Sequence, residues 1–160
     1  MEKEGILLET GTNEVEILEL LIGGQLVGIN VLKVKQILTY DEKMVTALNA
    51  PGTHQALRGT MLFQDEAVLL IDLGLYLYPT AQHQPATTQV VVICAFNNSL
   101  QGFLIDGVDR ICRLTWDQFQ APSALIASTQ ALVTGIATID QREVLMVDFA
   151  SILDEYAQTD

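Results

Sequence analysis

Two histidines and two cysteines are the side chains of this 160-residue chain that could most readily act as base and nucleophile. A thiol hydrolase needs an accessible cysteine thiolate close to a histidine. Cys94 lies inside a valine-rich run, 90–96, that is typical of a buried strand, while His54 and His83 fall in segments expected to be loops. Cys112 is also flanked by apolar residues. The pattern therefore predicts buried, unreactive cysteines and no catalytic pair.

Other motifs that carry chemistry are also missing from the sequence. It contains no CxxC or HExxH pair and no EF-hand spacing. Gly23-Gly24 lacks the glycine spacing and the lysine of a phosphate-binding loop. Asp72 and Asp148 each precede a helical pattern, which favours helix caps over catalytic carboxylates. We therefore expect no enzymatic activity, no cofactor and no metal, and a small β-barrel enzyme is kept only as an alternative.

Composition places the chain among globular proteins with a sizeable core. Hydrophobic residues make up 49% of the sequence, and the formal net charge is −12. An acidic chain repels nucleic acid and anionic lipid, so neither is an expected direct partner. No apolar run approaches the roughly 18 residues that cross a bilayer, and no signal-peptide pattern follows Met1. Together with the lack of a disulfide framework, these features predict a cytoplasmic protein.

An internal repeat organises the sequence. Adding 74 to the segment 28–38 gives 102–112, and adding 76 to the segment 59–73 gives 135–149. The matched positions include Gly28 with Gly102, Val34 with Val108, Gly59 with Gly135, and Asp72 with Asp148. Apolar strands resemble one another by composition alone, but paired glycines and aspartates mark turns and caps and so favour a duplication. We expect a single domain over 1–160 with internal halves at about 14–80 and 87–156.

Short strand patterns alternate with tight turns in each half. Strands are expected over 14–22, 25–29, 45–48, 57–63, 67–71, 89–96, 100–105, 134–139 and 143–147, with turns at 23–24, 64–66, 97–98 and 140–141. A helical turn is expected over 115–119, and helical segments are expected after Asn30, Asp72 and Asp148. The apolar faces are Val31, Val34, Ile37 and Leu38 after Asn30, and Phe149, Ile152, Leu153 and Tyr156 after Asp148. The pattern predicts a mainly β fold of two small barrels packed together, and it leaves open which strands are exchanged between the halves.

Without catalytic residues, function is expected to reside in surfaces. A crevice between two packed barrels suits an apolar partner helix. Val34 and Val108 recur at equivalent positions of the two halves, and either line such a crevice or belong to the core. Lys33 and Lys35 are expected to face solvent, and Trp116 is expected in the core.

Several stretches together resemble the CheW-like domain of chemotaxis coupling proteins. They are Thr10 to Ile17, Gly28 to Val34, Gly59 to Leu73, Leu114 to Asp117 and Gly135 to Asp148. The Gly-Thr-Asn-Glu opening at 11–14 is similar to the start of the CheV subfamily in particular. The resemblance covers about residues 5–156. It implies two related five-stranded SH3-like barrels that share a core, with short helices and a C-terminal amphipathic helix.

The resemblance also implies a function without catalysis. CheW-like adaptors join the cytoplasmic tip of chemoreceptors to the regulatory domain of the histidine kinase CheA, at membrane-associated receptor arrays. Carried over by position, the receptor groove would include Val34, Gln36 and Leu38 from the first half, and Gly102 and Val108 from the second. CheV proteins carry a receiver domain after this one, so a receiver is expected in the full-length chain. The alternative is a regulatory fragment of a CheA-type kinase, which the Gly-Thr-Asn-Glu opening disfavours.

One position departs from the family pattern. Relatives often carry Asn-Leu-Arg-Gly where this chain has residues 62–65, so the usual arginine is Gln64. A neutral glutamine cannot take the place of an arginine in an ion pair. Gln36, where many relatives carry glutamate, is neutral too, and we interpret the two changes as a matched loss of opposite charges.

Overall fold

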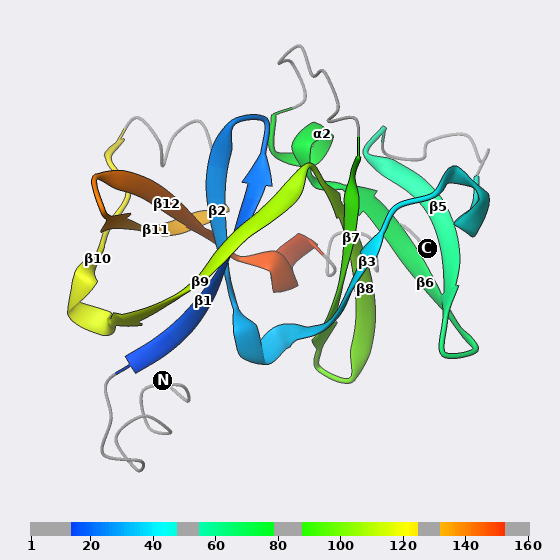
Figure 1. Ribbon diagram of the computed structural model, residues 1–160, viewed down its shortest axis with the longest axis horizontal. Helices are drawn as coiled ribbons and strands as arrows, with labels where there is room; N and C mark the ends of the chain where they lie inside the picture. Colours follow the sequence, from blue (N-terminus) through cyan, green and yellow to red (C-terminus); the bar gives the residue numbers. More distant parts are fainter. Residues whose placement is uncertain (1–13, 48–54, 79–87, 125–131, 153–160) are drawn as a thin grey trace.

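The computed structural model describes residues 14–47, 55–78, 88–124 and 132–152. Its regular structure is mainly β, in two six-stranded sheets that lie on opposite sides of the molecule in Figure 1. Sheet 1 has the order β10 (Phe119–Gln120), β11 (Val133–Ile139), β12 (Arg142–Val147), β2 (Gln25–Asn30), β1 (Glu14–Ile22), β9 (Gly107–Thr115). Sheet 2 has the order β3 (Val34–Thr39), β7 (Val90–Phe96), β8 (Ser99–Ile105), β6 (Glu66–Asp72), β5 (Leu57–Phe63), β4 (Val45–Thr46). The mainly β fold is thus confirmed, with a two-residue strand as the sixth member of each sheet.

The two sheets do not correspond to the two halves of the sequence. The hairpin β1–β2 joins β9 to β12 in sheet 1, and the hairpin β7–β8 joins β3 to β6 in sheet 2. Parallel pairing of β2 with β12, and of β8 with β6, connects each hairpin to strands from the other half. Strands are therefore exchanged between the two halves, a point that the sequence left open. A repeat shows which segments are alike. It does not show whether each hairpin pairs with the strands of its own half or with those of the other half.

Four tight turns close the hairpins. Their central residues all have positive φ, as a type I′ turn requires, at Gly23-Gly24, Gln64-Asp65, Asn97-Asn98 and Asp140-Gln141. The first and third turns are 74 residues apart, and the second and fourth are 76 apart. This turn type matches the right-handed twist of the flanking strands, so the predicted hairpins are confirmed.

The segment after Asn30 is mostly strand, where a helix was predicted. Asn30 does cap a short 3₁₀ turn, Val31–Lys33, because its side chain accepts a hydrogen bond from the Leu32 N–H at 2.9 Å. The chain then becomes β3 and pairs antiparallel with β7. The apolar spacing at 34, 37 and 38 fits either structure over so few residues, and pairing with the exposed edge of β7 decides for the strand.

The two aspartate caps are present. Asp72 begins helix α2 (Leu73–Leu77), and its Oδ1 accepts a hydrogen bond from the Leu75 N–H at 3.2 Å. Asp148 accepts hydrogen bonds from the N–H and the Oγ–H of Ser151, at 3.3 and 2.6 Å, at the start of a helix over 149–152. The rest of the predicted apolar face, Leu153 and Tyr156, lies outside the described residues.

One core is shared by both sheets. Buried residues from β1, β2, β7 and β8 meet there with side chains of α2 and of the helix at 149–152, and Phe103 contacts Phe149 edge-on at 5.3 Å. A smaller cluster lies in sheet 2 around Leu70 and Ile93, and another lies in sheet 1 around Ile17 and Leu114. This arrangement confirms the expected shared core, to which both halves contribute side chains.

Candidate partner-binding surface

Strands β3 and β9 are counterparts in the repeat, and each lies at the edge of its sheet. Among the described strands, β3 pairs only with β7, and β9 pairs only with β1. In the view of Figure 1 both are drawn toward the viewer, β9 across sheet 1 and β3 across sheet 2. An edge strand leaves backbone groups on its outer side available to a partner.

A β-bulge interrupts the pairing of each edge strand. In β3 the extra residue is Lys35, between the pairs Val34–Cys94 and Gln36–Ile93. In β9 the bulge comes at the equivalent place in the repeat, between residues 108 and 111. A bulge breaks the in–out alternation of a strand. As a result, consecutive residues are exposed, at 35–37 in β3 and at 108–111 in β9.

Four of the five residues predicted for the receptor groove lie on these two strands. Val34 is half-buried against the shared core, and Leu38 is half-buried against the smaller cluster of sheet 2. Gln36 is exposed, and Val108 is 36% exposed. The fifth, Gly102, is buried in β8 between β7 and β6.

Gly102 has a packing role in this position. A Cβ added to it would lie 3.2 Å from the Leu69 carbonyl oxygen and 3.3 Å from Leu70 Cδ1. The absence of a side chain therefore lets β8 lie close to β6, and a buried glycine has no surface to offer a partner.

Sequence analysis missed two residues of this surface, Ile37 and Ile111. Ile37 on β3 is 41% exposed and Ile111 on β9 is 57% exposed, although isoleucine is usually buried. Adding 74 to the first gives the second, so the repeat held the signal. The helical interpretation hid it by assigning Ile37 to a core-facing side. Val34 and Ile37 on β3 are the repeat counterparts of Val108 and Ile111 on β9. We call these four residues the edge-strand surface.

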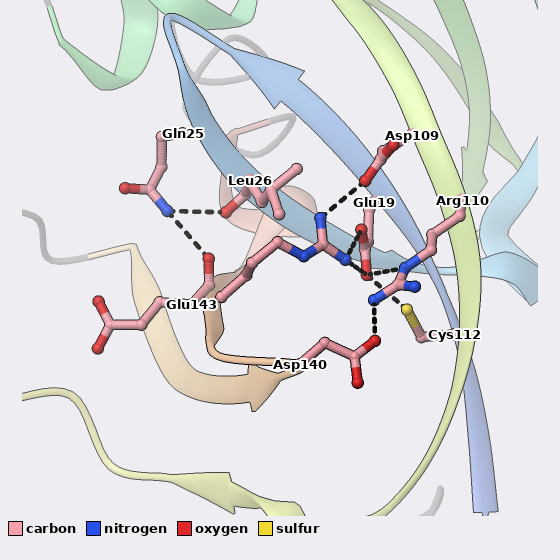
Figure 2. Close-up of polar contacts among 9 residues, drawn as sticks. Glu19, Gln25, Leu26, Asp109, Arg110, Cys112, Asp140 and Glu143 are labelled. Atoms are coloured by element: carbon pink, nitrogen blue, oxygen red, sulfur yellow. Dashed lines mark hydrogen bonds and ion pairs between the residues drawn. The ribbon is translucent and has the colours of Figure 1, made fainter.

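Beside Val108 and Ile111 lies a group of five charged residues and one cysteine, which we call the Glu19 cluster (Figure 2). Its members are Glu19, Asp109, Arg110, Cys112, Asp140 and Arg142. The Glu19 side chain is fully buried. Its carboxylate accepts hydrogen bonds from Arg142 Nη2 at 3.1 and 3.4 Å, from Arg110 Nε at 3.5 Å, and from the Cys112 thiol. Burial of a carboxylate is costly unless it is paired in this way.

The outer members of the cluster pair with one another. Arg110 Nη2 lies 2.7 Å from Asp140 Oδ2, and Arg142 Nη1 lies 2.8 Å from Asp109 Oδ2. The hydrogen bond to Asp140 raises the pKa of Arg110, and the one to Asp109 raises the pKa of Arg142. The hydrogen bond from Arg142 lowers the pKa of Asp109 below its usual range. Each of these shifts favours the charged form, so Asp109, Arg110 and Arg142 stay ionised around neutral pH.

Comparison with known proteins identifies the family. A family model for the CheW-like domain matches residues 16–157, which is most of the chain. This chain belongs to the CheW-like domain family. The CheW-like domain is 30% identical over 132 residues to chemotaxis protein CheV3 of Helicobacter pylori, and covers 41% of that protein. It is 28% identical over 139 residues to chemotaxis protein CheW of Klebsiella aerogenes, and covers 81% of that protein.

The fold of this CheW-like domain matches a solved structure as well. The scaffolding protein TtCheW from Thermoanaerobacter tengcongensis superposes with a TM-score of 0.71 at 17% sequence identity, covering 84% of this chain and 88% of that one. At such low identity the match shows the fold alone. Among the described residues, no helix combines the length and the apolar character needed to cross a bilayer.

The Glu19 cluster bears on the departure at Gln64. Adding 74 to Gln36 gives Arg110, and adding 76 to Gln64 gives Asp140. Arg110 on β9 and Asp140 in the β11–β12 turn form an ion pair through their side chains. The first half of this CheW-like domain has two neutral glutamines at the counterpart positions. The matched loss of charges stays a prediction, and this counterpart supports it.

A pocket of about 740 Å³ is lined by residues of sheet 1 and of the helix at 149–152. It is lined by apolar residues of β1, β2 and β12, by Lys33, and by Trp116 and Phe119, whose rings are 5.3 Å apart. Trp116 is half-buried and packs against the cluster around Ile17 and Leu114, so it contributes to the core as predicted.

The cysteines of the CheW-like domain are expected to be unreactive in the native state. Burial raises the pKa of the Cys94 thiol to about 12. Burial, followed by the hydrogen bond to Glu19, raises the pKa of Cys112 to about 11. The thiolate, which is the reactive form, is therefore scarce at pH 8. We expect Ellman's reagent to label neither thiol within minutes at pH 8 in buffer, and to label both in 6 M guanidinium, where the ordinary pKa of about 8.5 returns.

The same shifts fix the sign of the pH dependence. Both pKa values are higher in the folded state, so the folded state holds protons that the unfolded state releases above pH about 8.5. Stability should therefore fall as the pH rises from that point towards 11 or 12. Rapid labelling of one native thiol at pH 8 would show that a thiol is exposed or ionised.

Proposed function

We propose that this CheW-like domain is a non-catalytic adaptor of bacterial chemotaxis, which couples chemoreceptors to the histidine kinase CheA. Its family and the chemotaxis names of two relatives support this proposal. The observation that carries it is the edge-strand surface, in which equivalent apolar residues are exposed on two equivalent edge strands. Contiguous exposed apolar residues mark protein–protein contacts, and we propose that one partner covers the matched residues of both strands.

The first proposed partner is the cytoplasmic tip of a chemoreceptor, a helical hairpin. An amphipathic helix presents apolar anchors along one face, and such anchors suit Val34, Ile37, Val108 and Ile111. Gln36 and Leu38 lie beside them on β3. The second proposed partner is the regulatory domain of CheA, and binding to both would place the protein at receptor arrays. The receiver domain expected of a CheV-type chain stays a prediction that the gene sequence beyond residue 160 can test.

Ile111→Arg tests the proposed receptor site directly. Ile111 is 57% exposed, so the change should alter the free energy of unfolding by no more than about 0.5 kcal/mol. In the complex the arginine would lie in a dehydrated apolar contact, and receptor binding should weaken by about 2 kcal/mol or more. Isothermal titration calorimetry with a receptor-tip hairpin measures the affinity.

Leu62→Arg is the matched control. Leu62 is also exposed and apolar, at 73%, but lies on β5 rather than on the edge-strand surface. It should bind the receptor tip as the wild type does. Equal loss of binding in both variants would remove the edge-strand surface from the site. A wild-type chain that binds neither the receptor tip nor the CheA regulatory domain would refute the adaptor function itself.

A further inference from the structure

The Glu19 cluster connects strands that are not neighbours in sheet 1. Strand β9 lies at one edge, and β1 and β2 separate it from the hairpin β11–β12. Yet Arg110 on β9 pairs with Asp140 in the turn of that hairpin, and Asp109 on β9 pairs with Arg142 at the start of β12. Figure 2 shows Arg110 and Asp140 reaching toward each other from these separate segments. Side-chain charges, rather than backbone hydrogen bonds, therefore close this end of the sheet.

The cluster is centred on the bulge of β9. Between the pairs Leu18–Ile111 and Leu20–Val108, strand β1 contributes the single residue Glu19, and β9 contributes two. The two bulged residues are Asp109 and Arg110, and both make ion pairs within the cluster. Val108 and Ile111 come directly before and after the bulge, and both are exposed. The cluster thus holds the segment that lies between the two apolar residues of the edge-strand surface.

We propose that Arg142 and Arg110, by clamping the bulge of β9 onto Glu19, are positioning residues that hold Val108 and Ile111 in the conformation a partner binds. The clamp itself concerns only the free chain, while the effect on binding rests on the proposed function. Arg142 is the central member because its two terminal nitrogens engage Asp109 and Glu19 at the same time. A planar guanidinium can make both contacts, whereas a lysine ammonium is a single point charge.

Sheet 2 lacks this clamp at the counterpart positions. Adding 74 to Glu19 gives Ile93, and the counterparts of Arg110 and Arg142 are Gln36 and Glu66. The isoleucine has no carboxylate to accept hydrogen bonds, and neither counterpart of the two arginines is a cation. The two edge strands therefore differ: ion pairs hold the bulge of β9, whereas no ion pair among the described residues involves the bulge of β3.

Amide hydrogen exchange of the free chain tests the clamp. In Arg142→Gln, Glu19 loses its closest cation, and the bulge should open locally because a buried carboxylate is then poorly paired. Exchange at 108–111 should speed up at least tenfold, while exchange in β7 and β8 stays unchanged. The matched control is Arg113→Gln on β9, whose exposed ion pair with Glu16 at 3.5 Å lies outside the cluster. Arg142→Lys should recover part of the protection from exchange at 108–111, because lysine keeps the positive charge but cannot contact Asp109 and Glu19 through two separate nitrogens.

Receptor-tip affinity supplies the second readout. Arg142→Gln should weaken binding of the receptor tip at least threefold. Arg113→Gln removes the same charge outside the cluster and should leave binding unchanged. If Arg142→Gln does not fold, Arg110→Gln replaces it, because Arg142 then still pairs with Glu19. Unchanged exchange at 108–111 would overturn the clamp, whether or not any receptor binds. The positioning role would be overturned by a different result: Arg142→Gln speeds up exchange at 108–111 but binds the receptor tip as the wild type does, while Ile111→Arg weakens that binding.

Discussion

Replacement of Gly59 by alanine is expected to destabilise the domain by at least about 3 kcal/mol, from backbone strain and overpacking together. Gly59 has a φ of 147°, which L residues rarely adopt. A Cβ there would lie 2.1 Å from the carbonyl oxygen of Thr46, so β5 could not keep its distance from β4. Because the clash is with backbone atoms, no side-chain rotation can relieve it. Urea denaturation followed by circular dichroism measures the loss.

Gly135→Ala is the control that the repeat provides. Gly135 is the counterpart of Gly59 in β11, but a Cβ there would lie 3.4 Å from the Gln120 carbonyl oxygen. Its substitution should cost no more than about 1 kcal/mol, as for most mutations without a steric clash. Equal midpoints for Gly59→Ala and the wild type would mean that β4 moves away freely and that this contact does not contribute to stability.

Val34→Arg is expected to weaken receptor binding by about 2 kcal/mol or more and also to lower the melting temperature. The two effects have one cause, because Val34 is half-buried against the shared core and also faces the edge-strand surface. A charge at this position must be dehydrated on binding, and its side chain disturbs the packing beneath it. A thermal melt and a titration with the receptor-tip hairpin separate the two effects.

Val108→Arg makes the comparison informative. Val108 is the repeat counterpart of Val34 but is 36% exposed and lies beside the bulge of β9. It should lose binding to a similar extent with little change in the melting temperature. If Val34→Arg is folded and binds normally, Val34 leaves the proposed site. If it is unfolded while Val108→Arg binds normally, Val34 belongs to the core and the partner lies elsewhere.

Local chemistry was enough to predict the turns, the caps and most of the strands. A type I′ turn needs two consecutive residues that tolerate positive φ. Glycine and asparagine do so, and Gly23-Gly24 and Asn97-Asn98 have positive φ. Asp72 and Asp148 cap helices through contacts only three residues along the chain. The burial of Cys94 followed from its apolar neighbours. These features depend on near neighbours, so the sequence contains them.

The features that only the tertiary structure decided depend on residues far apart in the chain. Val34 to Leu38 fits a helix or a strand by spacing, and the edge of β7 selects the strand. The repeat predicts two equivalent hairpins but not which strands each completes, because both pairings satisfy the same local pattern. Glu19 meets Arg142 across 123 residues, and no charge pattern in the sequence links them. Ile37 and Ile111 are apolar like the core, and only the bulged edge strands show that they face solvent. Contacts of this kind are set by which surfaces meet when the chain closes, and that information is distributed over the whole sequence rather than held in any one segment.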